Sequence, residues 1–298
     1  MAEYRMKILL CTDGSADAEL GARAAATLSG GSAAELHVVH VMGEVSPLLY
    51  PAGAPAAEYL AVFEERGRDL LAREVGKIRR LGGDVAGSHL RKGRPADQIL
   101  DLAEELEASL IILGSRGRGP VERLLLGSVS EEVVHHASHP VMVVRGGEGA
   151  WPPRRVVFGD DGSESARAAG DLAAGIGRLF GARGILVRAF LELPEADLEA
   201  RISDPRLVAD ARRRAERELE ERATELQEKL GERPRIRMTV GDAARALLEA
   251  AEEGDGEAAL IAIGRRGVGR MKRLWLGSVS TKVIRAARGS VLVCPPPP

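Results

Sequence analysis

The chain has 298 residues, of which 45% are hydrophobic and 29% charged, and its formal net charge is −2. This balance argues against the basic surface that nucleic-acid binding needs, and an aromatic content of 3% leaves few rings on which bases could stack. No apolar stretch approaches the ~18 residues of a membrane span. We therefore expect no nucleic-acid partner, no membrane segment and no signal peptide, and we predict a cytoplasmic protein.

Short apolar runs alternate with helical patterns along the first half of the chain. Continuous apolar runs of this kind are typical of strands in a parallel sheet that is covered on both faces. The predicted strands, in chain order, are 8–11, 36–41, 85–90, 110–113 and 141–144. The predicted helices between them are 16–28, 56–81, 95–106 and 129–137.

The second half repeats this alternation. Its predicted strands are 156–158, 185–187, 236–240, 260–263 and 291–294, and residues 205–230 form an amphipathic helical pattern. Strand–helix alternation predicts an α/β protein with doubly wound, Rossmann-like parallel sheets.

The repetition extends to short motifs. Asp13-Gly14-Ser15 recurs 148 residues later as Asp161-Gly162-Ser163. A period this long indicates two tandem domains rather than a solenoid, whose repeats run ~20–50 residues. We predict one domain over residues 1–147, a glycine- and proline-rich linker over 148–153, and a second domain over 154–298.

A glycine pattern follows the fourth strand of each half. It reads Gly-x2-Gly-x9-Gly-Ser at residues 114–128 and again at 264–278. Glycine permits close backbone approach, and the Gly-Ser pair precedes a helical pattern whose free N–H groups and dipole attract anions. The sequence therefore predicts a duplicated phosphate-binding loop, and we expect the Gly127 amide to approach phosphate.

These loops fall where ligands bind in open α/β sheets. Asp13 follows the first predicted strand and Gly114 follows the fourth. Ligands bind beyond the carboxyl ends of the strands, where the strand order reverses. A strand order of 3-2-1-4-5 would place these two residues side by side.

The combined motif resembles the ATP-binding branch of the universal stress proteins, and its two copies resemble the tandem members of that family. The resemblance implies two five-stranded sheets of order 3-2-1-4-5, each binding ATP or ADP, with or without Mg²⁺. It implies that Asp13 and the backbone of Val41 hold the adenosine, and that the glycines and serines of the loop hold ribose and phosphates. The first expected site comprises Thr12, Asp13, Val41, Gly114, Arg116, Gly117, Arg118, Gly127, Ser128, Val129 and Ser130.

The second expected site matches the first, with one departure that adds charge. Asp160 stands where the first half has Thr12, which places a second carboxylate beside the expected ligand. The second site comprises Asp160, Asp161, Ala189, Gly264, Arg266, Gly267, Gly277, Ser278, Val279 and Ser280.

Two functions remain open from the sequence. One is a regulatory stress-response protein whose nucleotide state controls its interactions. The other is a slow ATP hydrolase or nucleotidyl-transferring enzyme on the same fold. We assign no catalytic residue, because neither loop carries the carboxylate cluster that efficient phosphoryl transfer needs. We also expect no metal site, because His135, His136 and His139 lie where a helix C-terminus favours cationic side chains.

The last strand of each half predicts an assembly within one chain. Residues 141–144 and 291–294 are apolar and would otherwise be open sheet edges, which invite pairing. We expect these two strands to face each other as an intramolecular pseudo-dimer. Homodimerisation of whole chains is left open by the sequence.

Overall fold

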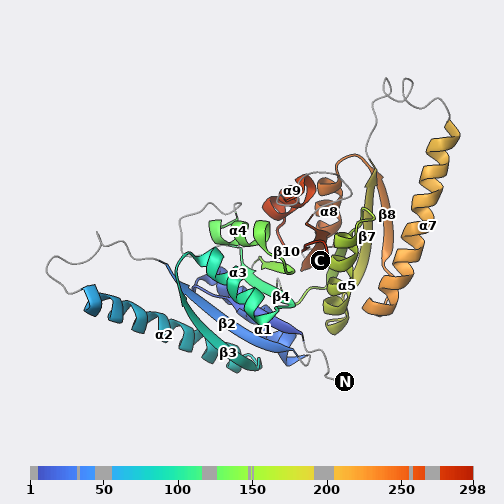
Figure 1. Ribbon diagram of the computed structural model, residues 1–298. Coiled ribbons are helices and arrows are strands. Elements are labelled where there is room, and N and C mark those ends of the chain that lie inside the picture. Colours follow the sequence, from blue (N-terminus) through green and yellow to red (C-terminus); the bar gives the residue numbers. More distant parts are fainter. Residues whose placement is uncertain are drawn as a thin grey trace. The chain divides into compact units, whose positions relative to one another are not determined.

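The computed structural model divides into two compact units of alternating strands and helices (Figure 1). The first unit contains Met1–Pro152 and Ser290–Pro295, and the second contains Pro153–Arg270 and Gly277–Gly289. The structure describes residues 6–31, 34–43, 56–115, 126–146, 149, 151–190, 205–254, 258–265 and 276–297.

The first unit contains a parallel sheet in which the earliest strand is central. β1 pairs with β2 on one side and with β4 on the other, so that Ile8 lies opposite both Leu36 and Leu110. The parallel strands, in spatial order, are β3 (Val85–Lys92), β2 (Glu35–Met42), β1 (Lys7–Cys11), β4 (Leu110–Gly114) and β5 (Val141–Val144). The order 3-2-1-4-5 agrees with the expectation for this half.

Helices cover both faces of this sheet. Glu74 of α2 reaches Thr12 on one face, whereas Glu105 of α3 pairs with Arg91 on the other. α1 contacts α2, and α3 contacts α4. The four helices are α1 (Ala16–Gly30), α2 (Ala56–Arg80), α3 (Pro95–Leu106) and α4 (Ser128–His136). The two-sided cover explains why residues 8–10 of β1 and 110–112 of β4 are apolar and fully buried.

The second unit repeats this arrangement. β6 pairs in parallel with both β7 and β9, and β7 pairs with β8. Its strands are β8 (Arg235–Val240), β7 (Arg183–Phe190), β6 (Arg155–Gly159) and β9 (Ala259–Gly264). Its helices are α5 (Glu164–Leu179), α7 (Pro205–Leu230), α8 (Ala243–Glu252) and α9 (Ser278–Ala286). The predicted tandem α/β, Rossmann-like fold is confirmed.

The last strand of the chain lies in the first unit. β10 (Ser290–Cys294) runs antiparallel to β5, with Val291 opposite Val143 and Val293 opposite Val141. The predicted pairing of the two terminal strands within one chain is therefore confirmed, and β5 is not an open edge. By its contacts β10 groups with the first unit, and the domain bounds of 1–147 and 154–298 stay a prediction.

Among the described residues, none of the helices combines the length and apolar character needed to cross a bilayer. The longest helices, α2 and α7, are amphipathic and pack one side on their sheets. In α7, Leu219, Ala223 and Leu226 are fully buried on one stripe, as the sequence pattern predicts.

Candidate functional site

The turn that follows β1 is built by side chains that bind their own backbone. The Asp13 carboxylate accepts a hydrogen bond from the Ser15 N–H at 3.0 Å, and the Thr12 hydroxyl accepts from the Gly14 N–H at 3.2 Å. Gly14 has a φ of 73°, which favours glycine. Ser15 then caps α1 by accepting from the Ala18 N–H. This local chemistry fixes Asp13 at the carboxyl end of the central strand.

The turn that follows β4 packs against the start of α1. A Cβ added to Gly114 would lie 2.5 Å from the Asp17 carbonyl carbon, so only glycine fits there. The Ser115 hydroxyl donates to the Asp17 carboxylate at 2.5 Å. The structure thus brings the Asp13 turn and the Gly114 turn together, with the first turn of α1 between them.

The Gly127-Ser128 pair begins α4 beside the same turn. The Gly127 N–H donates to the Ser115 carbonyl at 2.8 Å, and the Ser130 hydroxyl donates to the Gly114 carbonyl at 2.8 Å. Our expectation that the Gly127 amide approaches phosphate is therefore wrong, because that N–H is already bound. The amides left to face a ligand are those of the first helical turn, residues 128–130.

No described side chain caps the start of α4. Gly127 is the N-cap residue, with φ −65° and ψ 148°, and it has no side chain that could accept a hydrogen bond. In contrast, Ser15 caps α1, Ser163 caps α5 and Asp242 caps α8. The side chain of Ser128 is exposed at this end of the helix. The positive end of α4 is thus not neutralised by a side-chain cap of its own.

The second unit repeats this geometry closely. Gly277, the N-cap of α9, has φ −64° and ψ 153°, again with no side-chain cap among the described residues. Its N–H donates to the Arg265 carbonyl at 2.9 Å, and the Ser280 hydroxyl donates to the Gly264 carbonyl at 2.8 Å. A Cβ on Gly264 would lie 2.7 Å from the Ala166 nitrogen. In the described residues, both motifs therefore join the end of the strand to the start of the helix through the same pair of hydrogen bonds.

The two units differ at the residue before the aspartate that both turns share. The Asp160 carboxylate accepts from the Arg188 guanidinium, whose Nε lies 2.9 Å away, and Arg188 also reaches Glu218 of α7 at 2.9 Å. Burial disfavours the charged guanidinium, but the hydrogen bonds and charges of Asp160 and Glu218 raise the pKa of Arg188. In the first unit, the His40 ring nitrogen Nδ1 instead hydrogen-bonds the Thr12 carbonyl at 2.9 Å. In the second unit, the additional carboxylate of Asp160 is therefore paired with the guanidinium of Arg188.

The remaining expected residues divide into placed and undescribed ones. Val41 and Ala189 lie near the carboxyl ends of β2 and β7, and both are partly exposed. Asp161 is exposed and accepts from the Ser163 N–H at 3.0 Å, as Asp13 does in the first turn. Arg116, Gly117, Arg118, Arg266 and Gly267 lie outside the described residues.

Sequence reasoning missed the residues that connect the turns. Asp17 and Ser115 join α1 to the β4 turn, and Arg188 neutralises Asp160. One signal was available, because the change from Thr12 to Asp160 accompanies a change from His40 to Arg188 at the same 148-residue interval. Such a paired substitution is typical of spatial contact.

The site suits an anionic ligand with a nucleoside part. A phosphate group fits the uncapped helix start, and an aspartate with strand-end backbone groups fits a nucleoside. No three His, Cys, Asp or Glu side chains among the described residues are arranged to hold a metal ion.

The chain matches the family model described as the universal stress protein family twice, over residues 5–145 and 153–295. A universal stress protein of Mycobacterium tuberculosis is 31% identical over 304 aligned residues, which cover 96% of each chain. A universal stress protein of Methanocaldococcus jannaschii is 34% identical over 140 residues, 47% of this chain and 81% of that protein. The crystal structure of a universal stress protein from Archaeoglobus fulgidus superposes with a TM-score of 0.67 and 23% identity, covering 97% and 98% of the two chains, which is a likeness of fold.

Proposed function

We propose that this chain, which belongs to the universal stress protein family, binds an adenine nucleotide, ATP or ADP, at up to two sites. Each site lies beyond the carboxyl ends of the central strands of one copy of the fold. We further propose that the bound nucleotide controls the interactions of the protein in a stress response. That it acts in the cytoplasm remains a prediction.

The observation that carries this proposal is the uncapped start of α4 and of α9. Ser15, Ser163 and Asp242 cap the first turns of α1, α5 and α8, whereas α3 follows Arg94 without a side-chain cap and begins at a proline, which has no N–H. α4 and α9 begin at glycines with nearly identical dihedral angles and leave the amides of their first turns to an outside acceptor. A phosphate group supplies such acceptors together with the negative charge that the helix dipole favours.

The rest of each site follows from its position in the sheet. We propose that Asp13 and the Val41 backbone contact the adenosine in the first unit, and that Asp161 and the Ala189 backbone do so in the second. The serines and glycines of the loops then lie on the ribose and phosphate side. Arg116, Arg118 and Arg266 belong to the loop segments between the paired glycines and are proposed to contact phosphate.

The first experiment asks whether a nucleotide binds at all. Freshly purified protein is denatured, the released small molecules are separated by chromatography, and emptied protein is titrated with ATP and with ADP in a calorimeter. We expect adenine nucleotide in the released fraction or binding in the titration. Absence of both at millimolar nucleotide would contradict the proposal. Steady-state rates with ATP and Mg²⁺ test the enzymatic alternative, for which kcat of ~1–10³ s⁻¹ is typical.

The second experiment removes one amide from the proposed site. Proline is tolerated at the first position of a helix, and the extended ψ of 148° at Gly127 suits a residue that precedes proline. Ser128→Pro therefore deletes one N–H that would face phosphate while leaving the helix intact. We expect at least a tenfold weaker affinity at the first site, about 1.4 kcal/mol.

Matched variants separate the amide from the side chain and one site from the other. Ser128→Ala keeps the N–H and removes only the hydroxyl, so its affinity should stay closer to that of the parent. Ser278→Pro should weaken the second site alone, because Gly277 has the same extended geometry. Equal affinities for Ser128→Pro and the parent protein would contradict phosphate binding at the start of α4.

A further inference from the structure

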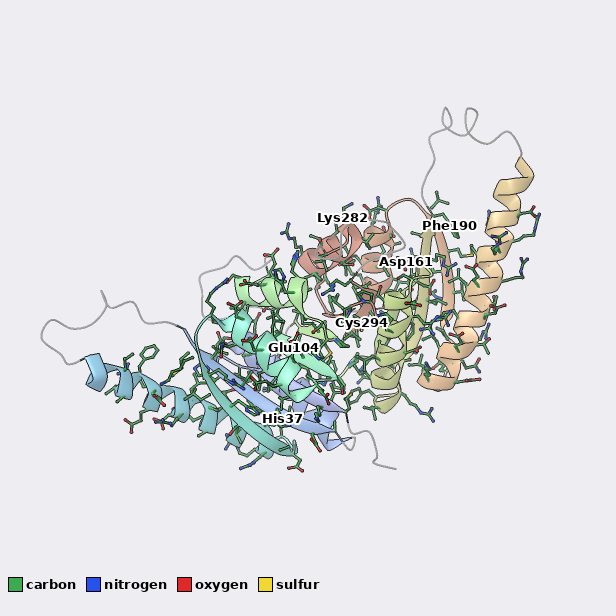
Figure 2. All side chains as sticks on the ribbon, viewed as in Figure 1. His37, Glu104, Asp161, Phe190, Lys282 and Cys294 are labelled. Carbon is green, nitrogen blue, oxygen red and sulfur yellow. The ribbon has the colours of Figure 1, made fainter. Side chains whose placement is uncertain are left out.

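Two histidines of the first unit meet outside the proposed nucleotide site. His37 lies on β2 and is labelled in Figure 2, and His89 lies on the neighbouring strand β3. The His37 Nδ1 and the His89 Nε2 are 3.0 Å apart, and the ring centroids are 5.3 Å apart. Both rings are half-buried, so this nitrogen pair is held by the sheet yet remains accessible to solvent ions.

The sheet makes room for this pair. Gly87 lies directly opposite His37 in the register of β2 and β3. A Cβ at Gly87 would lie 2.6 Å from the His37 Nδ1 and 3.1 Å from the His89 Nε2. Any other residue at this position would push the two rings apart. The glycine therefore permits the close approach of the two nitrogens.

We propose that His37 and His89 form a two-nitrogen site for a late first-row divalent metal ion, with Zn²⁺ as the reference ion. Imidazole nitrogen binds Zn²⁺ at ~2.0–2.1 Å, so two nitrogens in tetrahedral geometry are about 3.3 Å apart. The observed 3.0 Å is within a few tenths of an ångström of that separation. An ion bound to both nitrogens in this geometry lies beside the line that joins them, so both rings would also turn to aim their lone pairs at it.

Proton balance allows this exchange without a change in charge on the rings. In the hydrogen-bonded pair, one facing nitrogen carries the shared proton and the other accepts it. When the metal binds, the donor ring moves its proton to its outer nitrogen, and both facing nitrogens offer lone pairs. The two neutral imidazoles then coordinate the ion, and water fills the remaining positions.

Burial is the main influence on the pKa of both rings, and it favours their neutral form. Burial lowers the pKa of His37, opposed by Glu35 and aided by Lys7. Burial also lowers the pKa of His89, aided by His37 and Arg91 and opposed by Glu105 of α3. Neutral imidazole is the form that binds metal.

The second unit provides an internal contrast. Ile185 and Arg237 occupy the positions that match His37 and His89, with the same pairing register between their strands. Ile185 is buried, and Arg237 pairs with Glu249 and Glu253. The inferred metal site is therefore a property of the first unit and does not depend on the proposed nucleotide function.

The test titrates the full-length protein, first freed of metal with a chelator, with ZnCl₂ in a calorimeter. We expect one Zn²⁺ ion to bind per chain. Its affinity should fall at least tenfold in His37→Asn and in His89→Asn, and the double variant should bind no more weakly than either single variant. His136→Asn in α4 is the matched control and should leave this binding unchanged. The spectrum of bound Cu²⁺ should show two coordinating nitrogens in the parent protein and fewer in either variant.

Three outcomes would overturn the proposal. The first is that the protein binds no Zn²⁺ at millimolar concentration. The second is that His89→Asn leaves the affinity for Zn²⁺ unchanged, and the third is that His136→Asn alone abolishes the binding. Circular dichroism checks that each variant is folded. If His37→Asn does not fold, His89→Asn and His89→Gln decide the result, because β3 pairs with β2 alone among the described strands and His89 is half-buried.

Discussion

Gly114 illustrates how a residue can belong to a binding motif for a structural reason. A glycine in a loop motif suggests space for a ligand, whereas the space at Gly114 is filled by the backbone of Asp17 and Ala18. We expect Gly114→Ala to destabilise the first unit by about 1–3 kcal/mol, since the added Cβ forces backbone shifts in a packed region. The free energy of unfolding in denaturant measures this loss.

Gly175 in α5 supplies the control for this prediction. Nothing lies within 4 Å of a Cβ added there. Alanine has the higher helix propensity, so Gly175→Ala should stabilise by roughly 0.5–1 kcal/mol. A neutral effect of Gly114→Ala beside a stabilising Gly175→Ala would show that the β4 turn moves freely away from α1.

The Asp160–Arg188 pair allows a prediction about compensation. Both side chains are about nine-tenths buried, so Arg188→Met leaves a buried carboxylate without its cation. We expect a loss of about 3 kcal/mol in the free energy of unfolding. Adding Asp160→Thr, which copies Thr12 of the first unit, should recover part of that loss because it removes the isolated charge. A double variant no more stable than Arg188→Met alone would contradict this account.

The parts of the site that could be predicted from the sequence are those that depend on the order and spacing of residues along the chain. The strand ends, the two aspartate turns and the glycine loops follow from local spacing, and the structure places the described ones at the carboxyl edges of the sheets. The contact of Ser115 with Asp17 could not be predicted, because it joins residues 98 positions apart through side-chain geometry. The Gly127 amide was misassigned because sequence does not show which carbonyl an N–H meets.

At the scale of elements, the contact between β2 and β3 predicts a dependence of stability on pH. Burial lowers the pKa of His37 and His89 below the ordinary value of 6.5, so the unfolded chain binds more protons than the native one. Stability contributed by this pair is therefore present above pH 6.5 and is lost as the pH falls below it.

Unfolding in denaturant at several pH values between about 7.5 and 5 measures this effect. Each proton contributes at most about 1.4 kcal/mol per pH unit. The double variant His37→Asn with His89→Asn should give a flatter profile than the parent. Burial also lowers the pKa of His139, which leaves a residual slope in the same direction. Carboxylates with lowered pKa values, such as Glu225, act only at more acidic pH. An unchanged slope would mean that the two rings separate without cost.

The first residue of a helix can be predicted from the sequence where a side chain caps the helix, and less directly where it does not. Ser15 and Ser163 stand before their helices at the same interval as the aspartate turns, and both cap as their residue type predicts. α4 and α9 begin at glycine, so their boundaries depend on the hydrogen bonds to Ser115 and Arg265 across the loop. This difference explains why the start of α4 was predicted within one residue while the partner of its N-cap amide was not.

At the scale of the whole molecule, β10 is part of the same compact unit as the first half of the chain. The chain leaves the first unit after Pro152 and returns to it at Ser290. The returning strand covers β5, whose four residues are all buried. The family match over residues 153–295 includes this strand, which is hydrogen-bonded to β5 of the first copy. The cover on β5 therefore depends on residues at the far end of the sequence.

This dependence predicts the behaviour of a shortened chain. Residues 1–152 lack β10, so the apolar strand β5 becomes an open edge that can pair with another copy. We expect this fragment to self-associate in light scattering at micromolar concentration, while the full chain under the same conditions does not gain mass by this route. A peptide spanning residues 288–296 should reduce the association by occupying the edge, and a scrambled peptide should not. A folded fragment that stays monomeric would show that β5 needs no partner strand, and the pairing with β10 would then be a consequence of tethering rather than of edge chemistry.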